Sequence, residues 1–408
     1  MSAFKCRVSG EDLEEVVDFG MQPLGNGFLL PNQIPGEYFF SMRCGFSETS
    51  MLFQLLEQPE AEKMFHENYA FYSSTSKFMA QHFEKFFQSV VSEGYLTGED
   101  PFVVELGCND GIMLKHFAKN NYRHLGIEPS KNVADVAAQQ GINTLTEFFS
   151  EATAEKIVRS HGHADAFLAA NVMCHIPQIL DIARGIKKLL KPTGVAIFED
   201  PYLGDVVKKI SYDQIYDEHV FLFSGLSVQY LFNQCGMELI DVLPQSTHGG
   251  SMRYVVANKG ARPVKESVKK LLDQEKAEKL DKLSTFHTFA KNVANSKSNL
   301  VKLLVELKSQ GKKVVGYGAT SKSTTIFNYC QIGPELIDFI VDTTPIKQGK
   351  LTPGMHIPVL PYEAFKENLP EFVFLLAWNH AEEIMQKESA FSNGGGKYIM
   401  HVPQVGVI

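Results

Sequence analysis

Tyr216, Glu218 and His219 stand within four positions of the chain and supply the side chains that proton transfer at neutral pH requires. Histidine titrates near neutral pH, a carboxylate can orient or charge it, and a phenol can give a proton to a developing oxyanion. Two further histidines, His175 and His248, stand in polar segments at the ends of predicted strands. A single histidine is more often structural, but three histidine-bearing loops at one sheet edge predict a general acid–base site.

A glycine-rich loop at 107–111 predicts a ligand site. Residues 103–106 before it read as a short buried strand, and residues 112–120 after it are amphipathic. Small residues let the backbone approach a ligand closely, and the N-terminus of the helix offers unpaired N–H groups. The acid Glu105 before the loop would repel a pyrophosphate, so the ligand is predicted to be cationic or neutral.

Glu128 is the predicted partner of a ribose in that ligand. It ends a second strand at 124–127 and follows the first glycine by roughly twenty residues, the spacing at which an acid accepts both ribose hydroxyls. The loop does not spell the GxGxxG of dinucleotide sites. Together these features predict S-adenosylmethionine, a ribose-bearing sulfonium without a phosphate. The alternative is an ordinary βα turn whose glycines only tighten the connection.

A second α/β unit begins with a strand over 313–317 and repeats this arrangement with a different loop, GYGAT. Lys322 falls in the first turn of the next helix, where its charge can offset that of a phosphate, so this loop is the better candidate for a pyrophosphate. The following strand at 336–341 ends in Asp342, the ribose acid available in this unit. The alternative is a structural βαβ half with a solvent-facing lysine.

The apolar pattern predicts the framework that must position these loops. Residues 1–55 contain short strand-like runs broken by Gly, Pro and Asn and predict a small, loop-rich appendage, which a helical pattern over 61–91 follows. Two or three connecting helices are expected between 264 and 312, with their lysines as a solvated face. Further strand candidates alternate with helical segments such as 179–190; they are 164–170, 195–199, 237–242 and 253–257. This alternation predicts a doubly wound, mostly parallel sheet with the ligand at the carboxyl ends of its strands.

Length and charge restrict the class of protein. The 408 residues exceed what one core supports and indicate about two to three domains. A net charge of −8 gives no basic footprint for nucleic acid or an anionic membrane. The first residues lack the apolar core of a signal peptide and no stretch has the length of a membrane span, so we expect a cytoplasmic protein. The six cysteines form no Cys-x-x-Cys pair and are expected to be reduced.

Motifs along nearly the whole chain resemble those of the nucleotide-sugar C-methyltransferases, most closely the C-3'-methyltransferases of branched deoxysugar pathways. They are, in order, VELGCNDGIML, NVMCHIP, FEDPYLGD, YDQIYDEH, STHGGSMRY, VVGYGATSKS, VDTTPIKQGKLTPGMHIPV and LAWNHAEEI. The resemblance implies an α/β protein of three domains. These are a small N-terminal loop- and strand-rich module that binds zinc in relatives (1–57), a doubly wound S-adenosylmethionine-dependent methyltransferase domain (58–260), and a C-terminal Rossmann-like domain that binds a nucleotide sugar (261–408).

The resemblance also implies a reaction. A 4-keto group acidifies the C-3 proton of a dTDP- or GDP-linked deoxysugar, His219 would remove this proton, and the resulting enolate carbon would attack the sulfonium methyl. Glu218 would orient His219, while Tyr216 and His175 would act near the keto oxygen or return a proton. Methylation at C-5 and either nucleotide stay open, and we expect a monomer. The predicted cofactor-binding residues are Glu105, Gly107, Asn109, Asp110, Glu128 and Asn171. The predicted substrate-binding residues are Tyr69, Tyr72, Asp200, His248, Tyr317, Thr320, Lys322, Asp342 and Asn379.

The chain departs from the family in its N-terminal module. Relatives hold zinc with two Cys-x-x-Cys pairs, because a structural zinc site needs four ligands. Here Cys6 is followed by Ser9, and the second pair falls on Ser47 and Ser50. A serine hydroxyl is a poor zinc ligand and Cys44 cannot complete a site, so we expect zinc to be absent. A second departure is Phe71, which stands where relatives tend to place a tyrosine facing the substrate; Tyr69 or Tyr72 would take that role.

Three alternatives compete with this interpretation. An O- or N-methyltransferase acting on another small molecule would need the first loop, but neither a base for a C–H proton nor a second nucleotide domain. A nicotinamide-dependent oxidoreductase would use GYGAT as its cofactor site and Tyr216 as its acid, which leaves the first loop without a use. A non-catalytic nucleotide-sugar sensor would have no need of the proton-transfer residues.

Overall fold

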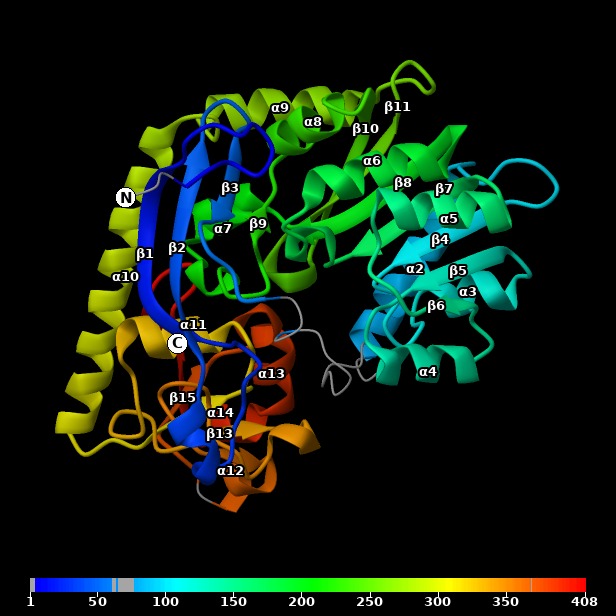
Figure 1. Cartoon of the computed structure of the whole chain (residues 1–408). Helices are drawn as coiled ribbons and strands as arrows, with labels where there is room; N and C mark the ends of the chain where they lie inside the picture. The colour runs from blue at the N-terminus through cyan, green and yellow to red at the C-terminus, as the bar shows by residue number, and fades with distance from the viewer. Residues whose placement is uncertain (1–3, 61–63, 65–76, 368) are drawn as a thin grey trace.

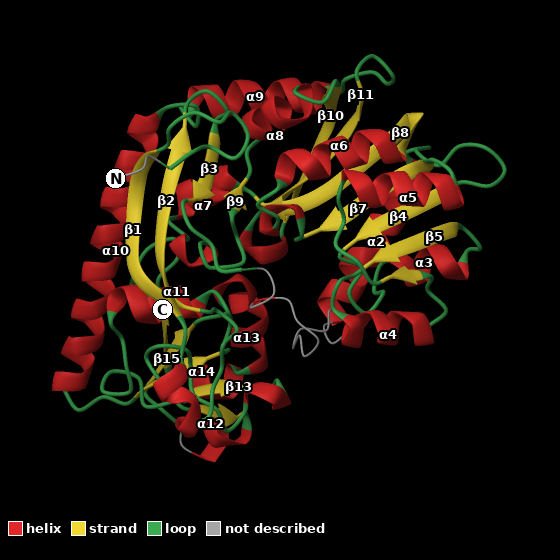
Figure 2. Ribbon diagram, in the orientation of Figure 1, coloured by secondary structure: helices red, strands yellow, loops and turns green. Residues whose placement is uncertain are grey.

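The computed structural model describes residues 4–60, 64, 77–367 and 369–408. The described chain contains three β-sheets with helices packed around them (Figures 1 and 2). The predicted fold class, a mixed α/β protein built from an N-terminal module and two α/β units, is confirmed.

The middle sheet has the order β10-β11-β8-β7-β4-β5-β6. Its strands are β4 (Phe102–Leu106), β5 (Arg123–Ile127), β6 (Thr144–Leu145), β7 (Ala164–Ala170), β8 (Leu190–Pro201), β10 (Met237–Gln245) and β11 (Ser251–Asn258). All neighbours are parallel except β11, which runs antiparallel between β8 and β10. The mostly parallel sheet is therefore confirmed, with one reversed strand that the apolar pattern did not reveal.

Both faces of this sheet are covered, as a doubly wound fold requires. Alternate residues of one strand belong to different cores: Val104 packs with Ile182 of one layer of helices, whereas Val103 packs with Phe117 of the other. The helices of the first layer are α5 (Glu151–His161), α6 (Ile179–Leu189), α8 (Gly225–Asn233) and α9 (Glu266–Ala277). Those of the second are α2 (Lys77–Ser92), α3 (Leu114–Lys119) and α4 (Lys131–Gln139). Because the strands of this sheet are buried on both faces, their sequences are continuous apolar runs.

The N-terminal module is an antiparallel sheet with loops between its strands, so the predicted loop- and strand-rich module is confirmed. Its strands are β1 (Glu14–Pro23), β2 (Phe39–Ser47) and β3 (Leu52–Leu55), joined by β9 (Phe221–Leu222) from the middle α/β unit. Strand β9 follows His219 by one residue and pairs with β3. The register of β1 against β2 shifts between Asp18 and Met21. Such a bulge interrupts the alternation of apolar and polar residues by which a strand is recognised in a sequence.

The C-terminal sheet has the order β14-β13-β12-β15-β16-β17 and is parallel except for its last strand. Its strands are β12 (Val314–Tyr317), β13 (Ile340–Asp342), β14 (Val359–Pro361), β15 (Phe372–Leu375), β16 (Lys397–Met400) and β17 (Gly406–Val407). The helices of this part are α10 (Leu283–Ser309), α11 (Ser323–Cys330), α12 (Glu363–Glu367), α13 (Ala381–Lys387) and α14 (Ser389–Asn393). The predicted strand 336–341 begins only at Ile340. Two or three connecting helices were expected between 264 and 312, and two are observed, α9 and α10.

One hydrophobic core joins the N-terminal sheet to the C-terminal domain. Phe286 of α10 is fully buried, with its ring centroid 4.0 Å from that of Phe46 on β2 and 5.5 Å from that of Phe53 on β3. The same core continues to Ile340 and Phe374 of the C-terminal sheet. Figure 1 shows α10 running alongside β1 and β2. The N-terminal sheet is therefore held by the C-terminal domain.

The described residues include no helix long and apolar enough to cross a membrane. All six cysteines are free, as their scattered spacing predicted.

Phe286→Ala is expected to lower the free energy of unfolding by about 3–5 kcal/mol, because it leaves a cavity between the two sheets. Urea unfolding followed by far-UV circular dichroism measures this change. Val305→Ala on the same helix is the control, since Val305 is 50% exposed and its truncation should change the free energy by less than about 0.5 kcal/mol. Equal effects of the two substitutions would contradict the shared core.

Candidate functional site

The loops after β4, β5, β7 and β8 meet at the carboxyl edge of the middle sheet. Gly107 has a φ of +65°, and a Cβ atom there would lie 2.5 Å from Cγ2 of Val172, so the loop after β4 lies directly against the loop after β7. Only glycine fits this position without strain. Asn109 and Asn171 also have positive φ values, 49° and 55°, which asparagine tolerates better than most residues.

Glu128 is fixed across the glycine loop. Its Oε2 accepts from the Asn109 N–H (3.1 Å) and its Oε1 from the Ser130 N–H (2.9 Å). Each carboxylate oxygen has a second lone pair, which leaves capacity for two hydroxyl donors. Burial raises the pKa of Glu128, while these hydrogen bonds act to lower it.

Two buried acceptors near this loop have no hydrogen-bond partner among the described residues: Glu105 Oε2 and Asn171 Oδ1. Burial raises the pKa of Glu105 well above its usual range, and the neighbouring Glu128 and Asp110 act in the same direction. A buried acceptor without a donor is costly. These groups therefore fit a ligand that brings donors and positive charge, as the ammonium and ribose of S-adenosylmethionine would.

His219 lies on the segment after the short 3₁₀ helix Tyr212–Gln214, and both of its ring nitrogens are engaged. Nδ1 is 2.7 Å from the Gln214 carbonyl oxygen, which can only accept, so Nδ1 carries the proton. Nε2 is then the basic nitrogen and accepts from the Tyr216 hydroxyl (2.9 Å). Burial lowers the pKa of His219 well below its usual range. The ring is therefore neutral at pH 7.

His175 stacks on His219, with ring centroids 5.3 Å apart. Burial lowers the pKa of His175 to about 3, so this ring is also neutral. Donor atoms of Cys174, His175 and His219 lie within 4.8 Å of one another, close enough for a metal ion. Because hydrogen bonds occupy both nitrogens of His219, this group does not fit a metal site. Nearby, burial raises the pKa of Asp200 to about 7, with the charge of Glu199 acting in the same direction.

Glu218 does not orient His219, so that part of the prediction is wrong; the Gln214 carbonyl holds the ring instead. The carboxylate of Glu218 accepts from the side-chain amide of Asn26 (2.8 Å), which is 192 positions away. Its neighbour Asp217 accepts from the Gly25 N–H (2.9 Å). Burial raises the pKa of Asp217 to about 8, with Glu218 acting in the same direction, and burial also raises the pKa of Glu218. The motif search missed the N-terminal partners, for which a turn rich in Gly and Asn is the sole local signal.

Lys322 is buried, so the alternative of a solvent-facing lysine is wrong. Its side chain is 11% exposed, its Nζ donates to Asn379 Oδ1 (2.6 Å) and it lies 4.4 Å from the Trp378 ring centroid. Asp213 is 3.9 Å away. Burial lowers the pKa of Lys322, and Asp213 opposes that effect. A second cation, the partly buried Lys347, donates to the Ala319 carbonyl (2.7 Å) and was missed by the sequence analysis.

Asp342 bridges the glycine turn of the C-terminal unit. Its Oδ2 accepts from the Ala319 N–H and its Oδ1 from the Thr344 N–H, both at 2.7 Å. Thr320 Oγ1 accepts from the Ser323 N–H at the start of α11 (3.3 Å). Tyr317 lies in the core of this domain, where its hydroxyl donates to Glu388 (2.8 Å), apart from the Lys322 group. Its assignment to the substrate stays a prediction.

His248 is partly buried and has a φ of +54°, and the burial of its imidazole lowers its pKa to about 4. Its carbonyl accepts a hydrogen bond from Gln214, which connects it to the segment that carries His219. Tyr69, Phe71 and Tyr72 lie outside the described residues.

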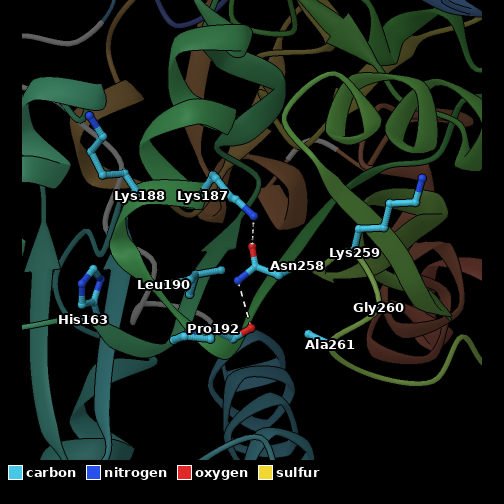
Figure 3. Close-up of a pocket in the computed structure, with 9 residues that line it drawn as sticks. All are labelled: His163, Lys187, Lys188, Leu190, Pro192, Asn258, Lys259, Gly260 and Ala261. Carbon is cyan, nitrogen blue, oxygen red and sulfur yellow. Dashed lines mark hydrogen bonds between the residues drawn. The ribbon is translucent and has the colours of Figure 1, made fainter.

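The hollow drawn in Figure 3, of about 510 Å³, lies at the opposite edge of the sheet, where β7 and β8 begin. It contains none of the predicted site residues. Its lining residues are His163, Lys187, Lys188, Leu190, Pro192, Asn258, Lys259, Gly260 and Ala261.

The positions at which relatives bind zinc do lie together. Cys6 Sγ is 3.2 Å from Ser50 Oγ and accepts from the Ser9 N–H (3.4 Å), and the Ser50 N–H donates to Ser47 Oγ (3.2 Å). Burial alone raises the pKa of Cys6, but hydrogen bonds from Ser50 and Ser9 outweigh it and lower the pKa. Cys44 is buried in the core around Phe286, whereas Cys6 belongs to the core of the middle sheet. One thiol and three neutral hydroxyls do not fit the ligand set of a structural zinc ion.

Comparison with known proteins places this fold and site in a class. Models of a methyltransferase domain and of a C-methyltransferase C-terminal domain match residues 75–242 and 246–403, and a model of a zinc binding domain matches residues 6–65. The protein is therefore an S-adenosylmethionine-dependent methyltransferase. The predicted boundaries after residues 57 and 260 stay predictions.

The relatives specify the class further. The chain is 32% identical over 407 residues to the C-methyltransferase NovU of Streptomyces niveus, covering 99% of this chain and 96% of that protein. It is 26% identical over 152 residues to a ubiquinone biosynthesis O-methyltransferase of Vibrio cholerae, covering 36% and 52%. The magnesium protoporphyrin IX methyltransferase of Synechocystis, solved with bound SAM, aligns with 44% of this chain and 79% of that chain (12% identity, TM-score 0.34). The chain belongs to the C-methyltransferase family that includes NovU, which favours methyl transfer to carbon over the O- or N-transfer and oxidoreductase alternatives.

The NMR signals of the histidine side chains test whether His175 and His219 are neutral. In ¹H–¹⁵N NMR of histidine-labelled protein, His175 and His219 are expected to stay neutral from pH 5 to 8, with the Nδ1–H tautomer at His219, because burial disfavours the imidazolium. Substitution of each histidine by Asn assigns the signals. A midpoint near pH 6.5 for the His219 signal would contradict a buried neutral base.

Proposed function

We propose that this enzyme methylates C-3' of a 4-keto-deoxy nucleotide sugar, linked to dTDP or GDP, in branched-chain deoxysugar biosynthesis. The observation that carries the proposal is the basic Nε2 of the neutral, buried His219, hydrogen-bonded to the Tyr216 hydroxyl. Removal of a C–H proton requires such a base, whereas a methyl acceptor that is already nucleophilic does not. Methylation at C-5 is the second candidate because the same base would serve it.

The reaction follows from the roles of these side chains. His219 Nε2 takes the proton from the carbon beside the ketone, and the Tyr216 hydroxyl transfers its hydrogen bond from Nε2 to the developing enolate oxygen. S-adenosylmethionine supplies the methyl group when bound. The carboxylate of Glu218, next to His219 in the chain, offsets the positive charge that His219 gains. His175, neutral and stacked on His219, shields this proton transfer from water.

Two groups of residues would hold the two ligands. Glu105, Glu128 and Asn171 offer the acceptors for S-adenosylmethionine, together with the backbone of the glycine loop. In the C-terminal unit Lys322 and Lys347 flank the turn at 316–320 and would balance the charge of a diphosphate. The active centre would lie between these units, where the loop with His219 contacts both.

An incubation with S-adenosylmethionine and a panel of dTDP- and GDP-4-keto-6-deoxysugars in deuterated water tests the activity by mass spectrometry. A gain of one methyl group on one sugar is expected and identifies the nucleotide. Deuterium uptake without methylation would support the base but not that sugar. No change on any sugar, with cofactor binding confirmed by calorimetry, would overturn the sugar proposal.

His219→Asn is expected to lower kcat by about 10²–10⁴-fold, because the amide cannot accept the C–H proton. Its affinity for S-adenosylmethionine should stay within twofold of the unchanged enzyme in calorimetry. Glu128→Ala is the matched variant with the opposite pattern, in which cofactor affinity falls first. Full turnover by His219→Asn would remove it as the base, and unchanged affinity in Glu128→Ala would show that the cofactor site is misplaced.

We also propose that the N-terminal module functions without zinc and that hydrogen bonds between Cys6, Ser9, Ser47 and Ser50 take the place of the metal. Elemental analysis of the purified protein is expected to find no stoichiometric zinc. The triple variant Ser9→Cys, Ser47→Cys, Ser50→Cys should bind about one zinc per chain, because it restores four thiolate ligands on a preserved backbone. One zinc per chain in the unchanged protein would overturn the proposal.

A further inference from the structure

One turn of the N-terminal module, residues 24–27, reaches the candidate active site. The Gly25 N–H donates to Asp217 Oδ1 (2.9 Å), and the Gly25 carbonyl accepts from Thr324 Oγ1 on α11 (3.1 Å). A Cβ atom at Gly25 would lie 2.8 Å from Asp217 Oδ1 and 3.3 Å from the Ser321 carbonyl oxygen. The turn is therefore packed between the segment that carries His219 and the C-terminal glycine turn.

The side-chain amide of Asn26 forms hydrogen bonds to both neighbours of this turn. Nδ2 donates to Glu218 Oε1 (2.8 Å), and Oδ1 accepts from Ser321 Oγ (2.6 Å). The orientation of the amide is fixed because an ionised carboxylate can only accept, which requires the NH₂ group to face Glu218. The three groups belong to three different parts of the chain, since Asn26 is separated from Glu218 by 192 positions and from Ser321 by 295.

We propose that Asn26 is a positioning residue of the methyl-transfer reaction, which holds Glu218 ionised and in place on the segment that carries His219 and ties it to the C-terminal domain. This inference rests on the proposed function, in which Glu218 offsets charge on His219. It gives the N-terminal module a part in the chemistry that does not depend on a metal.

The groups around Glu218 show why a donor is needed there. Burial raises its pKa, and the carboxyl of the adjacent Asp217 is uncharged at pH 7 because its own pKa is raised to about 8. The amide of Asn26 and the charge of Lys347 act in the opposite direction. His219 and His175 are neutral and give no positive charge in the resting site. Asn26 is therefore one of two groups that keep this carboxylate charged.

The test compares Asn26→Leu, which keeps the size of the side chain, with the unchanged enzyme. Loss of a hydrogen bond to a charged group is expected to lower kcat roughly 10–100-fold. KM for both substrates should stay within about twofold. The acid limb of the kcat–pH profile should move to higher pH, because the pKa of Glu218 rises without its donor. Ser321→Ala, which frees the other end of the amide, should give a smaller change of the same kind.

A double-mutant cycle with Glu218→Gln separates positioning from stability. If Asn26 acts through Glu218, Asn26→Leu should cost little further activity in the Glu218→Gln background. Gln33→Ala is the control within the module, because its hydrogen bond to the Leu30 N–H lies away from the active-site segment and its loss should leave kcat unchanged. If the two substitutions instead lower kcat additively and the kcat–pH profile does not move, this inference is overturned while the proposed function stands. Full activity of Glu218→Gln would also overturn this inference, because Asn26 is argued to act through Glu218, whereas failure to methylate any sugar of the panel would overturn the proposed function.

Discussion

Burial of the polar segment 211–220 is the constraint on which the rest of the structure depends. Charged groups taken out of water need compensating partners, and this segment carries three carboxylates, Asp213, Asp217 and Glu218. Their partners come from other parts of the chain. Asp213 accepts from the Trp378 indole N–H of the C-terminal domain (2.6 Å), and the other two accept from one turn of the N-terminal module. The segment can therefore be buried only where all three parts meet.

The two α/β units show how one backbone arrangement can serve ligands of opposite charge. In each unit the acid after the second strand, Glu128 or Asp342, accepts from a backbone N–H of the preceding glycine loop. The difference lies in the side chains beside the loop. The first unit presents the acid Glu105, whereas the second presents the cations Lys322 and Lys347. Charge beside the loop, rather than loop shape, therefore distinguishes the two units.

The parts of the structure that local patterns encode could be predicted. The strand 164–170 is observed with those bounds, and the glycine loop lies at the carboxyl edge as expected, because apolar runs and turn residues act over short distances. Contacts between residues that lie far apart in the sequence could not be predicted. Adjacency in sequence suggested that Glu218 orients His219, but the backbone turns Glu218 toward Asn26 and leaves a carbonyl of Gln214 in that role. Backbone carbonyls have no sequence signature, and neither does the pairing of β9 with the N-terminal sheet.

Sheet pairing and shared packing explain how the N-terminal module can keep its position without a metal. A structural zinc ion stabilises a small fold that lacks a sufficient core. Here Leu29 and Leu351 exchange two backbone hydrogen bonds (3.2 and 2.9 Å), and Glu37 accepts from the Gly354 N–H and lies 2.7 Å from His356 Nε2. These contacts flank the turn at 24–27 on its C-terminal side, while β3 and β9 pair beyond the segment that carries His219. The turn is thus held in place by the C-terminal domain and by β9, the strand that follows the predicted base. The positions that correspond to zinc ligands lie at the other end of the N-terminal sheet. A metal ion there would not supply these contacts.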